Sequence, residues 1–323
     1  MNKPIAIIAG EPNSISSEII FKSWKLRKTY IHKPIIIIGS IYLLNLQKKK
    51  LKYHIKIKKI KSNFKIKDLN SAELPVFDIK YKQRKPFEKI SNKSNKYILD
   101  CFKIAINLIE KKKILGLINC PVSKETLFKN KNQGVTEYLS KKSRISGNEV
   151  MLIYNKKLSV SPLTTHIPLR KVSNKINKFR IVQKIKVINS FYKKYLKKNP
   201  NIGILGLNPH NFSLMQKNDE KKIISSAVKK IKKLKIKITG PISPDTSFMF
   251  LKRYKLDVIF GMYHDQVLTP FKTLFKYDGI NITLGLPYIR ISPDHGVATD
   301  IVGEKIANPK SLIESIKFFN SIK

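Results

Sequence analysis

Cysteine is scarce in this chain of 323 residues, and its two cysteines, Cys101 and Cys120, lack the spacing of a disulfide framework or a zinc knuckle. Arginine is scarce as well, since only seven of the 65 basic residues are Arg. Long apolar runs are missing, because the longest stretch, 34–46, is interrupted by Gly and polar residues and is too short to cross a bilayer. These absences exclude a disulfide scaffold and a membrane span and favour a cytoplasmic protein.

Three common catalytic motifs are also missing. No Gly-x-Gly-x-x-Gly follows a predicted strand, and neither Gly-x-x-x-x-Gly-Lys-Ser/Thr nor Gly-x-Ser-x-Gly occurs. A nucleotide hydrolase and a serine hydrolase are therefore disfavoured. A nicotinamide cofactor would have to bind without the usual Rossmann turn, and the sequence assigns no cofactor-binding residue.

Acidic residues are few, and 21 Asp and Glu against 65 Lys and Arg give a net charge of +44. Such a balance is typical of proteins that bind nucleic acid or anionic membranes. However, Arg is the preferred side chain for phosphate and base recognition, and here Lys carries the excess, scattered from Lys22 to Lys323. We interpret the charge as a solvated lysine surface, with a polyanion partner as the alternative.

Short apolar runs alternate with longer amphipathic ones, a pattern that predicts βα units and a mostly parallel sheet. The length is about twice that of a typical domain, so two domains or one large α/β unit are expected. Strands are predicted at 5–9, 35–39, 74–79, 114–119, 150–154, 158–164, 202–207, 235–238, 257–262 and 280–284. Helices are predicted at 94–112, 174–197 and 219–234.

Three of the six histidines share one position, because each follows the carboxyl end of a predicted strand. They are His166 after 158–164, His210 after 202–207 and His264 after 257–262. Ligands of open α/β sheets bind at this edge, where strand ends and helix N-termini converge. Three neutral imidazoles suit a divalent metal that keeps a position open for substrate, and Asp245, Asp265 and Asp294 are candidates to orient them. The alternative is three separate loop histidines.

Anion-binding side chains point to the same edge. The segment 279–290 runs a strand into a loop that carries Asn281 and Arg290, and Lys272 follows the third histidine by eight residues. The planar guanidinium of Arg290 suits a carboxylate or phosphate, although a surface ion pair is the alternative. Thr136 starts a predicted short helix. Its hydroxyl and the backbone N–H groups at the start of that helix can hold an anion.

Motifs along nearly the whole chain resemble one known family. They are Gly10-Glu-Pro with Glu18, Pro121-Val-Ser-Lys124, Thr136-Glu-Tyr-Leu, Thr164-Thr-His-Ile-Pro-Leu169, Gly206-Leu-Asn-Pro-His210, Gly240-Pro with Asp245-Thr, Met262-Tyr-His-Asp-Gln266, Asn281 to Arg290, and Asp294-His-Gly. Together they resemble the 4-hydroxythreonine-4-phosphate dehydrogenase family of pyridoxal phosphate biosynthesis.

The resemblance implies an α/β fold of the isocitrate/isopropylmalate dehydrogenase type, with two α/β domains and an active-site cleft between them. We place the first domain at 1–125 plus 291–323, and the second, with the metal ligands and the dimer interface, at 126–290. It further implies a homodimer whose active site lies at the subunit interface. No specific nucleic acid and no membrane partner are expected.

The resemblance also assigns roles to residues. The implied metal ligands are His166, His210 and His264, the last reaching in from the neighbouring subunit. The implied substrate contacts are Thr136, Lys272, Asn281 and Arg290, and the implied catalytic residues are Asp245 and Lys272.

The expected activity is oxidation of 4-phosphohydroxy-L-threonine with NAD or NADP and a divalent metal, which is zinc, magnesium or cobalt. The 3-oxo acid that forms loses carbon dioxide readily, because the adjacent carbonyl accepts the electrons. This reaction belongs to pyridoxine 5'-phosphate biosynthesis.

Three departures from the family pattern bear on substrate choice. Val135 stands where the family usually has a substrate-contacting His, and the loops at 10–18 and 211–215 carry side chains where the family has glycines. One alternative is therefore a dehydrogenase of the same fold that acts on another 4-phosphorylated hydroxy acid, such as a threonate or erythronate phosphate. An alternative of another class is a basic nucleic-acid-binding protein on a decayed enzyme scaffold.

Overall fold

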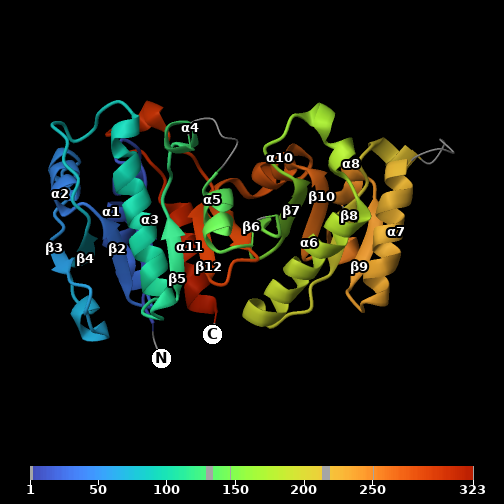
Figure 1. Ribbon diagram of the computed structural model, residues 1–323, viewed down its shortest axis with the longest axis horizontal. Helices are drawn as coiled ribbons and strands as arrows, with labels where there is room; N and C mark the ends of the chain where they lie inside the picture. The colour runs from blue at the N-terminus through green and yellow to red at the C-terminus, as the bar shows by residue number, and fades with distance from the viewer. Residues whose placement is uncertain (1–2, 129–133, 146, 213–218, 250, 323) are drawn as a thin grey trace. The chain divides into compact units, whose positions relative to one another are not determined.

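The computed structural model describes residues 3–128, 134–145, 147–212, 219–249 and 251–322 (Figure 1). Its contacts divide the chain into two compact units: unit 1 comprises residues 1–138 and 287–323, and unit 2 comprises residues 139–286. The sequence analysis placed the boundaries at 125/126 and 290/291. As a result Thr136 and Arg290, assigned there to the second domain, lie in unit 1.

Unit 1 is built on a parallel sheet. Within its described residues six strands lie in the order β3-β4-β2-β1-β5-β12, and every neighbouring pair is parallel. The Ile-rich runs of β1 and β2 are almost fully buried, as expected for strands that helices cover on both faces. The strands are β1 (Ile5–Ile8), β2 (Ile35–Gly39), β3 (Ile57–Ile60), β4 (Leu74–Asp78), β5 (Gly116–Asn119) and β12 (Ile289–Pro293).

The helices of unit 1 are amphipathic and pack through their apolar sides. The helix α3 contacts β1 and β2, and α11 contacts β12. The start of α2 is fixed by Ser40, whose hydroxyl accepts a hydrogen bond from the backbone N–H of Leu43. The helices are α1 (Ser16–Lys25), α2 (Ile41–Lys50), α3 (Asn95–Glu110), α4 (Lys124–Phe128), α11 (Lys310–Ser321) and α5 (Val135–Lys142), which runs across the boundary into unit 2.

Unit 2 contains a mixed sheet in the order β11-β6-β7-β10-β8-β9. The strand β6 is antiparallel to both of its neighbours, while β7, β10, β8 and β9 run parallel to one another. The parallel part therefore has a single carboxyl-terminal edge. The strands are β6 (Val150–Tyr154), β7 (Ser159–Thr164), β8 (Ile202–Leu205), β9 (Ile238–Ile242), β10 (Val258–Tyr263) and β11 (Ile280–Leu284).

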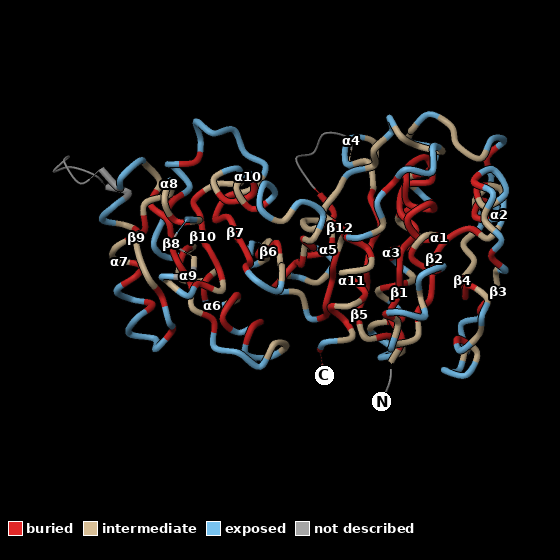
Figure 2. The backbone as a smooth tube through the Cα atoms, turned by 180° about the vertical axis from the view of Figure 1, so that it is seen from behind, coloured by how far each residue is buried: buried red, intermediate tan, exposed pale blue. Residues whose placement is uncertain are grey.

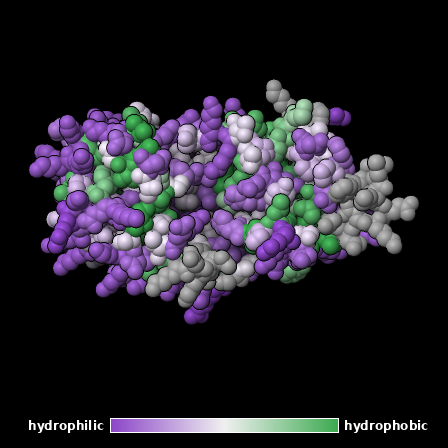
Figure 3. Space-filling view, turned by 90° about the horizontal axis from the view of Figure 1, so that it is seen from above, coloured by the Kyte–Doolittle hydropathy of each residue, from purple (hydrophilic) through white to green (hydrophobic). Residues whose placement is uncertain are grey.

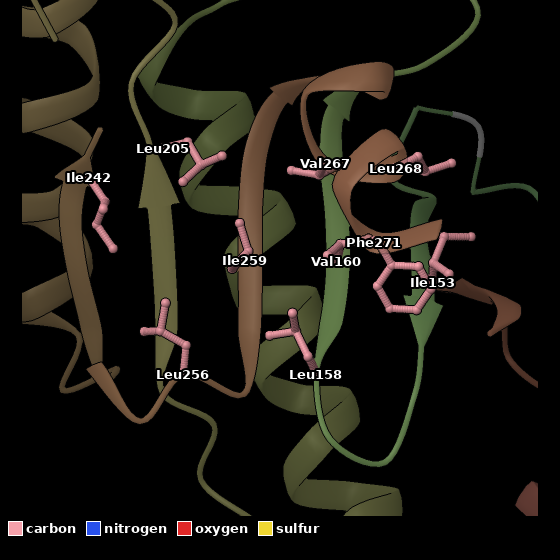
Figure 4. Close-up of a cluster of buried hydrophobic side chains, with 10 residues drawn as sticks. All are labelled: Ile153, Leu158, Val160, Leu205, Ile242, Leu256, Ile259, Val267, Leu268 and Phe271. Atoms are coloured by element: carbon pink, nitrogen blue, oxygen red, sulfur yellow. The ribbon is translucent and has the colours of Figure 1, made fainter. Parts of the chain in front are cut away.

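The core of unit 2 forms where α10 lies on the sheet. Figure 4 shows Val267, Leu268 and Phe271 of this helix together with buried side chains from the strands, among them Val160 and Ile259. Because α10 begins directly after β10, this packing also fixes the direction in which the chain leaves the sheet edge. The helices of unit 2 are α6 (Lys178–Phe191), α7 (Asp219–Lys233), α8 (Pro244–Ser247), α9 (Leu251–Tyr254) and α10 (His264–Phe275).

The lysine excess lies at the surface. Burial follows the strands (Figure 2), and hydrophilic side chains cover much of the face in Figure 3. Among the residues that the structure describes no lysine is buried, and the buried cation is Arg290. Across the same ranges, no helix combines the length and the apolar composition that crossing a membrane requires.

The prediction of an α/β fold with a mostly parallel arrangement is confirmed, and every predicted strand except 235–238 coincides closely with an observed one. The predicted strand 235–238 meets β9 at a single residue, Ile238, because β9 begins there and continues through the Gly240-Pro241 segment. The strand β3 was not identified, because its sequence Ile-Lys-Lys-Ile shows neither a continuous apolar run nor strict alternation.

Candidate active site

Three neighbouring parallel strands of unit 2 lead into the three predicted metal ligands. The strand β10 lies between β7 and β8, and all three run in the same direction. His166 comes shortly after β7, His264 directly after β10, and His210 in the turn after β8. The structure thus places the three histidines at one carboxyl-terminal sheet edge, which is where ligands of open α/β sheets bind.

Two of these histidines have an unusual backbone. The φ angles of His166 and His210 are 20° and 50°, in a region that a β-carbon disfavours. Such residues cost about 1–3 kcal/mol each and cluster at binding and catalytic sites. Non-glycine residues elsewhere in the chain, most of them lysines, also have a positive φ, so this backbone conformation does not by itself mark a site.

His166 and His264 lie side by side. Their ring centroids are 5.8 Å apart, and Nδ1 of His264 lies 2.7 Å from Oδ1 of Asp265. Two imidazoles that bind one tetrahedral metal hold their centroids about 5 Å apart, because each ligating nitrogen lies about 2 Å from the ion. The His166/His264 pair is somewhat wider than that, and Asp265 occupies the orienting position that the sequence predicted for it.

His210 has a different neighbour. Its Nδ1 lies 3.9 Å from Oδ2 of Asp245, at the start of the short helix α8 that follows β9. The other carboxylate oxygen of Asp245 accepts hydrogen bonds from the Ser243 hydroxyl at 2.8 Å and from the Thr246 backbone N–H at 2.9 Å. The Ser243 bond is the main reason why the pKa of Asp245 is lowered, so this carboxylate stays charged beside the imidazole.

The three predicted metal ligands do not form one cluster among the residues that the structure describes. Within the described ranges no three His, Cys, Asp or Glu side chains are grouped so that they could hold a metal ion. The donor chemistry of three imidazoles fits a divalent metal. In this structure two of the imidazoles, those of His166 and His264, lie side by side, and the third, that of His210, lies with Asp245.

Arg290 forms the centre of a second cluster, in unit 1. Its side chain is 3% exposed, and its Nε donates to Oδ1 of Asn119 at 2.7 Å. One terminal nitrogen lies 3.4 Å from the hydroxyl of Thr136, near the start of α5. The structure thus brings together two of the predicted substrate contacts, Arg290 and Thr136.

The location of Arg290 corrects one expectation. The sequence suggested a loop, but Arg290 lies inside β12, paired with β5, and is no surface ion pair. Burial lowers the pKa of Arg290 to about 10, against an opposing effect from Tyr288 and Glu137, so the guanidinium remains charged at neutral pH. Taking a cation out of water is costly unless anionic or polar groups face it. A buried arginine of this kind is suited to bind an oxyanion.

Lys272 and Asn281, the other two predicted substrate contacts, belong to unit 2. Lys272 is exposed and lies near the end of α10, on the helix that begins with His264. Asn281 lies within β11, and its side-chain oxygen is buried without a hydrogen-bond partner in the described part of the chain. An orphaned buried acceptor is a group that a bound ligand or water would satisfy.

Two of the three departures from the family pattern, Val135 and the loop at 10–18, lie within unit 1. Val135 is 4% exposed at the start of α5. In the loop at 10–18, Glu11 is fully buried, accepts hydrogen bonds from Ser94 and the Asn13 backbone, and has a pKa raised by burial. Glu11 and its hydrogen-bond partners thus hold the loop at 10–18 against the rest of unit 1. The departure at 211–215 falls largely outside the described residues.

An open groove of about 770 Å³ lies at the other edge of the unit 2 sheet. Its lining comes from residues that precede or begin β8, β9 and β10, including Lys198, Lys237 and Lys255. The parallel strands place this edge opposite to the histidines, so the groove is separate from the candidate site.

Sequence reasoning missed Asn119. It ends β5, and the signal available was a single polar residue at the carboxyl end of an apolar strand. That signal is weak by itself, because the bond to Arg290 depends on the pairing of β5 with β12, which are far apart in sequence.

A family model described as "Pyridoxal phosphate biosynthetic protein PdxA" matches residues 31–319. The chain belongs to the PdxA family. The resemblance seen in the motifs is thereby confirmed, as is the prediction of an oxidoreductase, because relatives and solved structures of the PdxA family are dehydrogenases.

Relatives of this PdxA family chain match along both units. A 4-hydroxythreonine-4-phosphate dehydrogenase of Sulfurihydrogenibium sp. is 39% identical over 97% of this chain and 96% of its own length. A protein of Oceanobacillus iheyensis named "Putative D-threonate 4-phosphate dehydrogenase" is 31% identical over 97% of this chain and 96% of its own. The solved 4-hydroxythreonine-4-phosphate dehydrogenase of Klebsiella pneumoniae is 29% identical, with a TM-score of 0.85 over 98% of this chain and 97% of that one.

Proposed function

We propose that this protein oxidises 4-phosphohydroxy-L-threonine to 2-amino-3-oxo-4-phosphooxybutanoate, which decarboxylates to 3-amino-2-oxopropyl phosphate, in pyridoxine 5'-phosphate biosynthesis. The observation that carries the proposal is the placement of His166, His210 and His264 at the carboxyl ends of three adjacent parallel strands, in a chain of the PdxA family. NAD or NADP is the expected oxidant, and a divalent ion is the expected metal.

The proposed metal ligands are the three histidines. When bound, a divalent ion polarises the substrate hydroxyl and a nicotinamide takes up the hydride from the same carbon. Asp265 and Asp245 orient the imidazoles of His264 and His210 and favour the tautomers that leave the other ring nitrogens available.

Some of the proposed contacts bind the anionic groups of the substrate, and others act at the carbon that is oxidised. Arg290, with Thr136 beside it, binds an oxyanion of the substrate, and Asn281 offers its unsatisfied oxygen to a substrate donor. Lys272 takes or returns a proton at the substrate hydroxyl, and Asp245 is a further polar group at the site. These contacts orient the reacting carbon, which is the main work of the chain's own residues.

A homodimer is part of the proposal, since the described residues of one chain include no group of three metal-binding side chains. Apolar side chains follow His166 at the surface of unit 2: Leu169 is 67% exposed and Phe179 is 70% exposed. We propose that a second copy covers them and supplies His264 to the site, as the family resemblance implies.

A second candidate substrate is D-threonate 4-phosphate, supported by the Oceanobacillus relative and by Val135 in place of the usual histidine. The two substrates differ at the carbon next to the carboxylate, which carries an amino group in one and a hydroxyl in the other. Val135 is 4% exposed and, as an apolar residue, forms no hydrogen bond with either group.

A substrate panel tests the proposed function. With zinc-, cobalt- or magnesium-loaded protein, NADH formation from 4-phosphohydroxy-L-threonine is expected to exceed that from D-threonate and D-erythronate 4-phosphates by at least about 10-fold in kcat/KM. Initial rates at 340 nm with each acid, and with NADP in place of NAD, give the comparison. The reverse order would assign the second candidate, and no turnover of any acid would refute both.

A further inference from the structure

Two neighbouring strands of unit 2, β8 and β10, separate before they reach the histidines that follow them. Their pairing ends at Phe260 with Ile204, and in the same register Met262 would lie opposite Gly206. On the other side of β10, the pairing with β7 continues to the end of both strands, and the Thr164 hydroxyl also donates to the Met262 carbonyl at 2.7 Å. The strand β10 is therefore held differently on its two sides.

The side-chain amide of Gln266 lies between Met262 and Gly206. Its Oε1 accepts a hydrogen bond from the Met262 backbone N–H at 2.7 Å, and its Nε2 donates to the Gly206 carbonyl at 2.8 Å. These two partners fix the orientation of the amide, because a backbone N–H only donates and a carbonyl only accepts. The amide thus takes the place of a direct bond between the strands and holds them one amide group apart.

The sequence leaves room for this amide. Gly261 lies beside it on β10, and a β-carbon there would lie 2.8 Å from Oε1 of Gln266 and 2.5 Å from Cγ1 of Val267. Both distances are shorter than van der Waals contact. The glycine therefore allows the side chain of Gln266, which belongs to the first turn of α10, to fold back onto the strand that precedes it.

The two sides of β10 account for how the histidines are arranged in this structure. On the β7 side the strands stay paired, and the imidazoles of His166 and His264 lie side by side. On the β8 side the Gln266 amide separates the strands, and the imidazole of His210 lies with Asp245 instead. The position of the turn that carries His210 thus depends on the Gln266 bridge.

We propose that Gln266 is a positioning residue of the candidate metal site, whose amide sets the separation between the chain segments that carry His264 and His210. The inference rests on the proposed function, in which both histidines bind a divalent ion. It deepens that function by giving a role to a residue that is no ligand itself. Each of the two segments supplies a ligand, so a shift of either changes the geometry that the ion meets.

The decisive variant is Gln266→Met, because methionine has a similar length but offers no N–H donor and only a weak acceptor. The probe is Co²⁺, titrated into the full-length protein in competition with a chelator. Its dissociation constant is expected to rise about 10-fold, as when groups that orient metal ligands are removed, and its visible absorption spectrum is expected to shift. Either change supports the proposal, and an unchanged constant with an unchanged spectrum overturns it.

A matched control separates positioning from general stability. Ser161→Ala removes a hydroxyl that donates to the Met151 carbonyl at 2.7 Å elsewhere in the same sheet. This variant is expected to lower the unfolding temperature and to bind Co²⁺ as the wild type does. If it alters Co²⁺ binding as much as Gln266→Met, a general loss of stability explains both results and the proposal is wrong.

A second variant decides if Gln266→Met does not fold. Gln266→Asn keeps both polar groups of the amide but is one methylene shorter, so it cannot span from Met262 to Gly206. Its dissociation constant for Co²⁺ is expected to rise as well. A constant equal to that of the wild type would overturn the proposal.

Failure of the proposed function gives a different result. If the wild type binds Co²⁺ but turns over none of the phosphorylated acids, the proposed function is wrong, and the comparison of Co²⁺ binding still decides the inference. If the wild type is active and Gln266→Met binds Co²⁺ in the same way, only the inference is wrong. A wild type that binds no Co²⁺ would also overturn the inference.

Discussion

Replacement of His264 by alanine is expected to lower kcat/KM for 4-phosphohydroxy-L-threonine by about 1,000-fold or more. The imidazole lies beside that of His166 and is oriented by Asp265. Removing one of three ligands weakens the hold on a divalent ion, and a Lewis acid contributes several kcal/mol to transition-state stabilisation, with each 1.36 kcal/mol equal to a factor of ten in rate.

A readout besides activity is needed, because a loss of turnover alone has many causes. The metal content per chain, measured by elemental analysis after dialysis, is expected to fall in the His264→Ala protein. His54→Ala serves as the matched control, because His54 is exposed in unit 1 and has no proposed role. Unchanged metal content with His264→Ala would show that this histidine is no ligand.

Replacement of Arg290 by methionine is expected to raise the KM for the phosphorylated substrate at least about 30-fold. A buried, charge-assisted contact to an oxyanion is worth about 2–5 kcal/mol when one partner is removed. Methionine fills much of the same space, so the loss reflects the charge and the hydrogen bonds more than packing. Steady-state kinetics over a wide substrate range, with the unfolding temperature of each variant, measure the effect.

Two comparisons make the Arg290 result interpretable. Arg290→Lys keeps the charge but loses the planar fork and the Nε bond to Asn119, so its KM is expected to lie between those of wild type and Arg290→Met. Arg84→Met removes an exposed arginine of the same unit and is expected to leave KM unchanged. A KM for Arg290→Met within about twofold of wild type would contradict the assigned role.

The strands of this fold were predictable because burial on both faces requires continuous apolar runs, as in the Ile-rich β1 and β2. The strand β12 was not recognised as a strand, because its sequence Ile-Arg-Ile-Ser-Pro carries an arginine and ends in proline. Its pairing with β5 depends on the tertiary structure, since β5 lies far away in sequence. That pairing is also what buries Arg290.

The candidate site was predictable where its signal is local in the sequence. The three histidines were identified because their position after apolar strands is local information, and the parallel order β7-β10-β8 brings them to one edge. The hydrogen-bond partners of the site residues were not all predictable. Asp265 is adjacent to His264 in sequence, whereas Asn119 meets Arg290 only because their strands pair in the sheet. The charge of +44 did not identify the site, because lysines cover the surface and the informative cation is the buried arginine.

The central claim is that three histidines from two copies of this chain form one metal site, and mixed dimers test it most directly. His210→Ala and His264→Ala proteins are each expected to be inactive. In dimers re-formed from an equal mixture, half the molecules carry one variant of each kind, and one of their two sites is intact, so activity is expected to return to about a quarter of wild type. An activity no greater than that of the separate variants would contradict the claim, because it would mean that His210 and His264 act in the same chain.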